Sequence, residues 1–148
     1  RHSRRCRGLI ALMLPLRHAP LWRLLSVLLL ILVLAAMLAP PGWLSSGSSV
    51  LSWFAHGDKL LHGLTFIVLA TWFAGFFERR RYLALAVWLT VFGLVGEACQ
   101  FLVGYRTADW LDIAANSLGI LLGLGIALAG LGGWGLWFEN RYSRRTQH

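Results

Sequence analysis

The sequence predicts an all-α, polytopic membrane protein built as an antiparallel bundle of four transmembrane helices. Of its 148 residues, 57% are hydrophobic and only 14% are charged, whereas an ordinary soluble domain carries about 25% charged residues. The mean hydropathy is +0.64. Four apolar segments are long enough to cross a bilayer, and the basic residues between them fall almost entirely on one side of the resulting arrangement.

The four segments are residues 21–39, 60–77, 82–103 and 113–138. As helices they would be roughly 27 to 39 Å long, against a hydrocarbon core of about 30 Å. The Arg-rich start followed by the first segment is similar to a signal peptide, but the apolar run is long for one and Ala39-Pro40 is a poor cleavage site. We therefore expect an uncleaved first span.

The two ends of the chain differ from the central segments. Residues 9–16 are too short to span and include Pro15, so we expect an interfacial or disordered arm there. The fourth segment is longer than a span needs and is rich in glycine over residues 130–135, so we expect its helix to break there. The following aromatic residues, Trp134, Trp137 and Phe138, would then lie in the membrane interface.

The distribution of basic residues predicts the topology. Of the 14 Lys and Arg residues, 12 precede the first span or lie at its start, follow the second or follow the fourth, which leaves only Lys59 and Arg106 on the other side. By the positive-inside rule, both termini are cytoplasmic and the loops 40–59 and 104–111 face outward. We expect a basic cytoplasmic arm over residues 1–20, the transmembrane domain over 21–138 and a basic cytoplasmic tail over 139–148.

The net charge of +8 raises the question of nucleic acid binding. Nucleic-acid binders display their basic groups as a stripe on a polar surface, whereas these Arg residues separate long apolar runs. We therefore expect no nucleic-acid partner.

Once the topology is set, most of the polar residues of the spans fall at their outer ends. Glu97, for example, lies 15 residues beyond Tyr82, or about 22 Å along its helix, and thus near the outer surface. We predict one outward-facing polar cup that binds substrate through Asp58, Lys59, His62, Glu97, Gln100, Arg106, Asp112 and Asn116.

Helical spacing places these residues on shared faces. In the fourth segment Asp112, Asn116, Gly119 and Gly123 recur every three or four residues. A Gly-x-x-x-Gly pair at this spacing lets two helices approach closely, so this face is expected to point into the bundle. A lone carboxylate facing lipid would cost about 2.5 kcal/mol or more, so Glu97 is also expected to face inward.

The cations available to Glu97 on this side are Lys59 and Arg106, and we expect one of them to pair with it. A purely structural interpretation also exists: the aspartates could cap helices, and the amides could be interhelical ties. Such roles explain each residue singly but not why nearly all of them gather at one end. Intramembrane ionisable residues are candidates for function, so we favour a shared site.

At these residues the sequence resembles the VanZ-like family of small bacterial membrane proteins, named for an accessory component of glycopeptide-antibiotic (teicoplanin) resistance. The resemblance covers roughly residues 22–127 and implies an envelope-associated membrane protein, located in the bacterial cytoplasmic (inner) membrane. It rests on Asp58-Lys59-Leu60-Leu61-His62, on Glu97-Ala98-Cys99-Gln100, and on Arg106, Asp112, Asn116, Gly119 and Gly123.

Three classes of function are open at this stage. The first is a binding or modulating protein whose cup holds a lipid-linked envelope precursor or a phospholipid headgroup, with Lys59 and Arg106 meeting phosphate or carboxylate. The second is an envelope hydrolase or transferase acting on a lipid-linked substrate, with His62 as general base oriented by Asp58, or with carboxylates holding a divalent cation. The third, a transporter, ranks lowest because the inner half of the bundle is almost purely apolar.

We favour the binding protein because no arrangement of a nucleophile beside a base is visible in the sequence. No cofactor is expected. No metal is expected either, because His62 is the only histidine in the predicted cup and zinc usually takes more His or Cys ligands.

Overall fold

The computed structural model describes residues 14–39, 57–104 and 109–145, without the side chains of residues 57–58 and 143–145. This part of the chain is helical and contains no strand. Arg106, the first 13 residues and most of the loop predicted to face outward after the first span lie outside it. The helices are α2 (Ala19–Met37), α5 (Gly57–Ala74), α6 (Tyr82–Val103), α7 (Trp110–Ile126) and α8 (Trp134–Arg145), with a 3-10 turn η2 (Arg79–Arg81) and a π-helical segment η3 (Ala127–Leu131).

The four predicted segments are all helical, with small shifts at their ends. Helix α2 begins earlier than predicted because Pro20 occupies its first turn, where a missing N–H costs nothing. Helix α5 begins at Gly57 and ends at Ala74 rather than at residue 77, because the chain turns at Gly75 and Phe76. Helix α6 has the predicted bounds and ends at Gly104, whose φ of 81° favours glycine.

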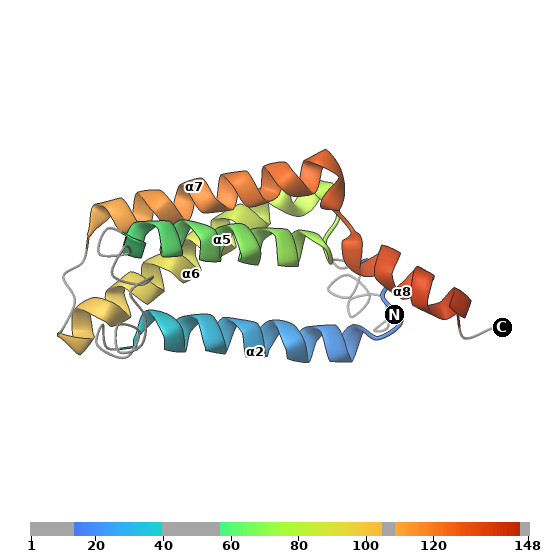
Figure 1. Ribbon diagram of the computed structural model, residues 1–148, viewed down its shortest axis with the longest axis horizontal. Helices are drawn as coiled ribbons and strands as arrows, with labels where there is room; N and C mark the ends of the chain where they lie inside the picture. The colour runs from blue at the N-terminus through green and yellow to red at the C-terminus, as the bar shows by residue number, and fades with distance from the viewer. Residues whose placement is uncertain (1–13, 40–56, 105–108, 146–148) are drawn as a thin grey trace, which may run out of the picture.

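The expected break in the last segment is confirmed. The π-helical segment η3 contains Gly130 at φ 152°, a conformation that residues with a side chain rarely adopt. The chain turns at Gly132 and Gly133, and α8 then leads away from α7 as a separate helix (Figure 1).

Helices α2, α5, α6 and α7 run alternately in opposite directions along the long axis (Figure 1). Therefore α5 and α7 begin at the same end of the molecule at which α2 and α6 finish. We call this the polar end. The opposite end, where α2 begins and α8 leaves the bundle, we call the basic end.

Helix α5 lies at the centre of the core. Phe66, Leu69, Ala70 and Ala74 on this helix are completely buried, and they pack against side chains of α6 and α7. The predicted glycine ridge of α7 does face α5: a Cβ on Gly123 would lie 2.6 Å from the carbonyl oxygen of Ile67. Close backbone packing of this kind stabilises helix pairs in lipid, where the hydrophobic effect gives no drive for association.

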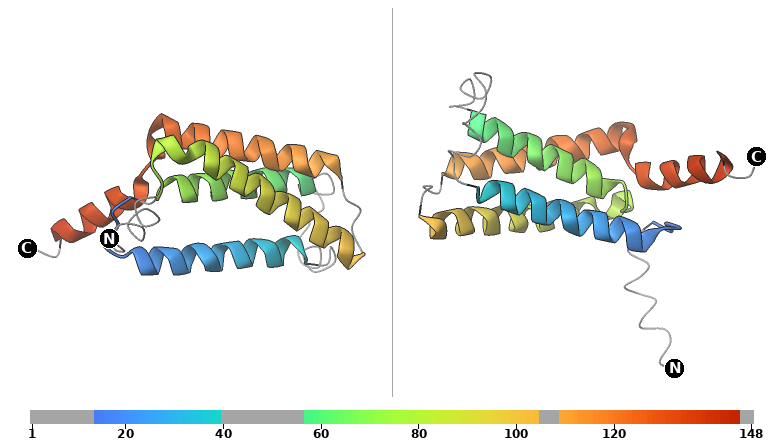
Figure 2. Two further views of the ribbon diagram at one scale, coloured as in Figure 1. Left: turned by 180° about the vertical axis from the view of Figure 1, so that it is seen from behind. Right: turned by 60° about the horizontal axis from the view of Figure 1, so that its bottom comes forward.

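Helix α2 is the peripheral helix. It lies along one side of the other three, next to α6 (Figure 2). Most of its apolar side chains are exposed, Leu32 by 66%, while Ser26 and Met37 are buried. Among the described residues, hydrogen bonds from Trp72 Nε1 to Ser26 Oγ at 3.0 Å and from Gln100 Nε2 to the Met37 carbonyl at 2.7 Å attach it to α5 and α6. A surface this apolar suits contact with lipid.

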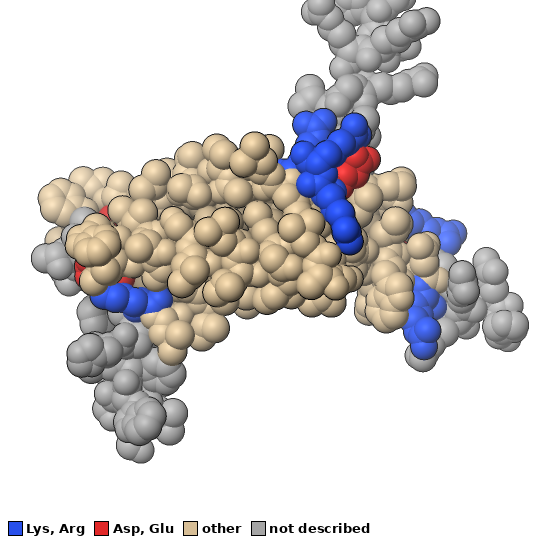
Figure 3. Space-filling model, turned by 90° about the horizontal axis from the view of Figure 1, so that it is seen from above, with Lys and Arg blue, Asp and Glu red and all other residues tan. Residues whose placement is uncertain are grey.

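Three described helical stretches are long and apolar enough to cross a membrane: Ala19–Met37, Arg79–Val103 and Trp110–Leu131. The apolar part of α5, Lys59–Ala74, is shorter. Length and composition thus support a membrane protein, and Figure 3 agrees: on the face it shows, charged residues gather toward the two ends and the middle carries none.

Candidate functional site

The described polar residues predicted to form a cup do gather at the polar end. They come from three helices: Lys59 and His62 from the start of α5, Glu97 and Gln100 from the end of α6, and Asp112 and Asn116 from the start of α7. Apart from Lys59, each of these residues is at least 95% buried. We call Lys59, His62, Glu97, Asp109, Asp112 and Asn116 the polar cluster.

Lys59 joins two carboxylates at the outer edge of the polar cluster. Its ammonium group donates to Asp109 Oδ2 and lies 3.3 Å from Asp112 Oδ1. The Lys59 side chain is 41% exposed, whereas that of Asp112 is only 6% exposed. The lysine therefore links the surface of the molecule to the buried part of the cluster.

Asp109 has two partners. It is the N-cap of α7, where its Oδ1 accepts a hydrogen bond from the N–H of Leu111 at 2.9 Å, and its other oxygen accepts from Lys59. These interactions, the lysine hydrogen bond first, hold the pKa of the Asp109 carboxyl below its usual value. The aspartate therefore stays charged and fixes the start of α7.

Deeper in the cluster, His62 lies between Asn116 and Glu97. Its Nδ1 is 3.1 Å from Asn116 Oδ1, within hydrogen-bond distance, and 3.7 Å from Glu97 Oε1, beyond it. These residues come from three different helices, so the imidazole connects α5, α6 and α7 through polar contacts. The structure places Asn116 and Glu97 beside His62; the side chain of Asp58, expected to orient it, lies outside the described part.

Two polar atoms of the cluster are buried and have no hydrogen-bond partner among the described residues: Glu97 Oε1 and Asn116 Nδ2. One is an acceptor and the other a donor. Gly93 on α6 leaves room for the amide, because a Cβ there would lie 3.3 Å from Asn116 Nδ2. Unpaired buried groups are costly, about 1–3 kcal/mol each, so their occurrence together requires an explanation.

Of the two predicted partners of Glu97, Lys59 forms no ion pair with it in the described part of the chain. The lysine is held by Asp109 and Asp112 instead, and the residue that Glu97 approaches is His62. Helical spacing correctly predicted that Glu97 lies on the inner face of α6. It could not predict which of the nearby carboxylates would pair with Lys59. The alternative partner, Arg106, lies outside the described residues.

The other predicted site residues occupy different places. Gln100 is buried at the same end, but it donates to the Met37 carbonyl and so ties α2 to α6. The backbone of Asp58 lies in the first turn of α5. Asp109, considered as a cap but left out of the predicted cup, belongs to the polar cluster through Lys59.

A second polar site, at the basic end, was missed by sequence reasoning. Glu139 on α8 is 7% exposed and accepts hydrogen bonds from the N–H groups of Arg17 and His18 and from Trp22 Nε1, at 2.6, 2.9 and 2.8 Å. The sequence placed it in a basic tail. No local pattern could have revealed its partners, since two of them are backbone groups more than 120 residues away.

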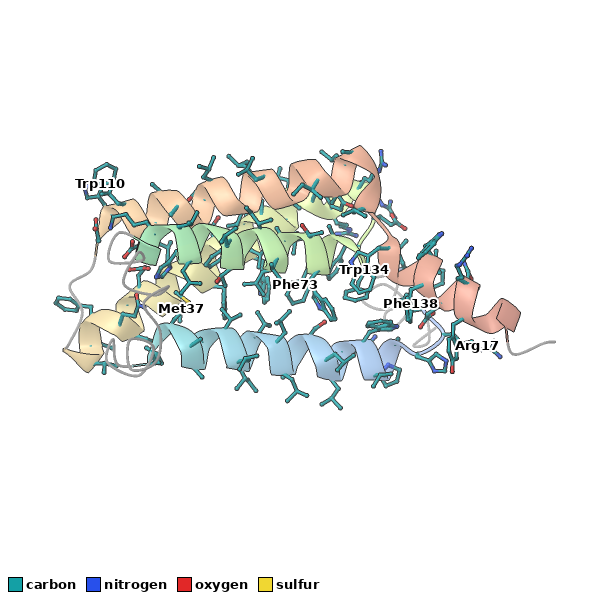
Figure 4. The ribbon with its side chains drawn as sticks, viewed as in Figure 1. Arg17, Met37, Phe73, Trp110, Trp134 and Phe138 are labelled. Atoms are coloured by element: carbon teal, nitrogen blue, oxygen red, sulfur yellow. The ribbon has the colours of Figure 1, made fainter. Side chains whose placement is uncertain are left out.

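Glu139 connects the start of α2 to α8 beside a group of aromatic rings. Trp22 packs against Trp72, Phe76, Trp134 and Phe138 at centroid distances of 5.3 to 6.2 Å. Figure 4 shows Trp134 and Phe138 at this end near Arg17, far from Met37 and Trp110 at the polar end. We interpret the basic end as a structural anchor and the polar end as the candidate site.

The polar cluster contains side chains that can ligate a cation as well as form hydrogen bonds. His62, Glu97 and Asp112 each offer one ligand atom, and these atoms lie within 4.8 Å of one another. The cluster also combines an imidazole with carboxylates, the groups used for proton transfer.

Comparison of the chain with models of protein families, with curated proteins and with solved structures finds no match. The site is therefore interpreted from its own residues.

Proposed function

We propose that this chain is a VanZ-like integral protein of the bacterial cytoplasmic membrane, whose polar end faces outward and binds the headgroup of a lipid-linked envelope component or a phospholipid. In this proposal α2, α5, α6 and α7 all cross the membrane and both termini are cytoplasmic. Binding, rather than turnover, is the primary activity.

Charge supports the proposed orientation. Lys59 is the only Lys or Arg among the described residues at the polar end, whereas the turn between α5 and α6 carries Arg79, Arg80 and Arg81. The helix α8 adds Arg141, which lies over the ring of Trp137 at 5.8 Å. An excess of basic residues marks the cytoplasmic surface, whereas aromatic residues are enriched at both membrane surfaces.

The binding proposal is supported by the two buried polar atoms that have no hydrogen-bond partner among the described residues. Glu97 Oε1 accepts hydrogen bonds and Asn116 Nδ2 donates them, and a hydroxyl group of a ligand can both donate and accept. Sugar and glycerol headgroups provide such hydroxyls at the membrane surface. The partly exposed Lys59 marks the side from which a headgroup would approach.

The test compares Asn116→Ala with Ser117→Ala, its neighbour in α7. Ser117 donates only to the Ile113 carbonyl of its own helix, at 2.8 Å, so its loss is a matched control. Cells expressing each variant are assayed for susceptibility to teicoplanin, with membrane abundance measured alongside. Wild type and Ser117→Ala should raise resistance above that of empty-vector cells, and Asn116→Ala should lose this protection at normal abundance.

Further variants extend this test to other residues of the predicted cup. Asp58→Asn, His62→Ala, Glu97→Gln and Arg106→Lys should each lose protection in the same way. The Arg106 variant keeps the charge but removes the planar guanidinium. Fully protective variants at normal abundance would contradict a shared binding site, and loss of protection that follows loss of abundance would favour a structural role.

A membrane-embedded hydrolase or transferase is the second candidate, favoured by the position of His62 close to Glu97 and within the same cluster as Asp112. A base beside a carboxylate is a common arrangement for proton transfer. Purified protein incubated with a polyprenyl diphosphate lipid would release phosphate if this candidate is correct, and the release would stop in His62→Ala.

A further inference from the structure

Three helices each contribute one metal-ligating side chain to a single buried location. His62 comes from α5, Glu97 from α6 and Asp112 from α7, and all three are at least 95% buried. Their ligand atoms lie within 4.8 Å of one another. Ligands that each stand about 2.0–2.2 Å from one ion are roughly 3 to 4.4 Å apart, so small side-chain movements would suffice to bind a cation.

The separation of His62 and Glu97 is consistent with this geometry. The 3.7 Å between His62 Nδ1 and Glu97 Oε1 is too long for a hydrogen bond, yet it falls within the range for two atoms that share one cation. Asn116 Oδ1 lies 3.1 Å from the same nitrogen. An ion bound by Nδ1 would therefore have this amide oxygen nearby as a further oxygen ligand.

Glu97 provides an independent observation. Its Oε1 is buried and has no hydrogen-bond partner among the described residues, and it lies 3.7 Å from Nδ1 of His62, another residue of this group. A buried carboxylate is stable only when it is paired, coordinated or neutralised. Lys59 forms no ion pair with Glu97, because its ammonium group is already paired with Asp109 and Asp112.

We propose that His62, Glu97 and Asp112 bind one divalent cation. One imidazole with two carboxylates suits a borderline ion such as Mn²⁺ or Zn²⁺ better than Ca²⁺, which prefers oxygen ligands alone. The sequence argued against a metal because it offers a single histidine here, but a mixed set from three helices is assembled only by the fold.

The proposed cation specifies how the proposed function would work, and its role in headgroup binding depends on that function. The described cluster holds Glu97, Asp109 and Asp112 against Lys59, so its carboxylates would repel a phosphate group. A bound divalent ion supplies the missing positive charge and a site for a phosphate oxygen. The ion would then take the place of a ligand hydroxyl at Glu97 Oε1, and a phosphate-bearing headgroup would be held by the ion and by Asn116 Nδ2.

The test uses the full chain purified in detergent, stripped with a chelator and titrated with Mn²⁺ or Zn²⁺ alone. Wild type should bind one ion per chain, measured by calorimetry and by elemental analysis after dialysis. Glu97→Gln and Asp112→Asn should each weaken binding at least about tenfold, which is the lower end of the loss seen even when a supporting group around a metal is removed. Glu78→Gln, an exposed carboxylate at the basic end, should bind like wild type.

Lys59→Gln separates this proposal from a purely structural role of the cluster. It removes a competing cation 3.3 Å from Asp112, so it should tighten metal binding even if it lowers thermal stability. No bound ion in wild type, or equal affinity in wild type, Glu97→Gln and Asp112→Asn, would overturn the cation site. Because the titration contains no lipid, its failure would leave headgroup binding to be judged by the resistance assay.

Discussion

At the scale of single residues, Glu97 and Glu139 are both buried carboxylates but have opposite surroundings. Glu139 accepts three hydrogen bonds from the start of α2, whereas Glu97 Oε1 accepts none among the described residues. A carboxylate with all its hydrogen bonds made stabilises the fold, while one left incomplete is available to a ligand. This contrast is why we assign structure to one end and function to the other.

Glu139 leads to a prediction about acid stability. Burial, the largest single effect, tends to raise its pKa, but the hydrogen bonds from His18, Arg17 and Trp22 outweigh it and the pKa is lowered. A lowered pKa in the folded state gives stability that is present above the unfolded value of about 4.3 and is lost as pH falls through the folded value. Protonation therefore weakens the attachment of α8 to α2.

The measurement is thermal unfolding in detergent from pH 7 to pH 3. Glu139→Gln should be less stable than wild type by about 1–3 kcal/mol at pH 7, the cost of leaving buried donors poorly satisfied. The difference should shrink below about pH 4, where wild type also loses the charge. A difference that does not change with pH would show that the charge of Glu139 contributes nothing.

At the scale of helices, the pairing of α5 with α7 positions the polar cluster. Gly119 and Gly123 let α7 lie directly on the backbone of α5, which brings Asn116 and Asp112, one and two turns earlier on the same face, against His62 and Lys59. A small displacement of this interface would separate the ligands of the site. The glycine ridge is therefore a determinant of site geometry as well as of packing.

Two glycines of α7 provide a matched test of this interface. A Cβ at Gly119 would collide with the Gly63 carbonyl oxygen, whereas a Cβ at Gly125 meets nothing within 4 Å. Gly119→Ala should therefore destabilise the bundle by about 1–3 kcal/mol, and Gly125→Ala should be neutral or slightly stabilising. Unfolding in detergent measures both, and equal effects would show that α5 and α7 do not pack as described.

The periodicity and hydropathy of the sequence predicted much of how the helices are arranged. The inward face of α7, the break near Gly130 and the common end of the polar residues follow from 3.6-residue spacing and from the lengths of the apolar runs. The partners of Lys59, Glu97 and Glu139 did not follow, because spacing along one helix does not say which residue of a neighbouring helix lies opposite. That information exists only once the helices are packed.

At the scale of the whole molecule, the two ends have distinct chemistry and the region between them is apolar. The charged residues gather toward the ends of the face in Figure 3, and the described helices between them expose large apolar side chains such as Leu32 and Leu83. Our account assigns the basic end to the cytoplasm and the polar end to the outer surface. The binding proposal depends on this orientation, since envelope precursors are used on the outer side.

The most direct test of this orientation is labelling of single cysteines in intact cells by a membrane-impermeant thiol reagent. Ser46→Cys reports on the first predicted outer loop and Ser143→Cys on the C-terminal tail, each in a chain with Cys6→Ser and Cys99→Ser. We predict that Ser46→Cys is labelled in intact cells and that Ser143→Cys is labelled only after the membrane is opened. Labelling of both positions from the same side would contradict the four-span topology and the outward-facing polar site.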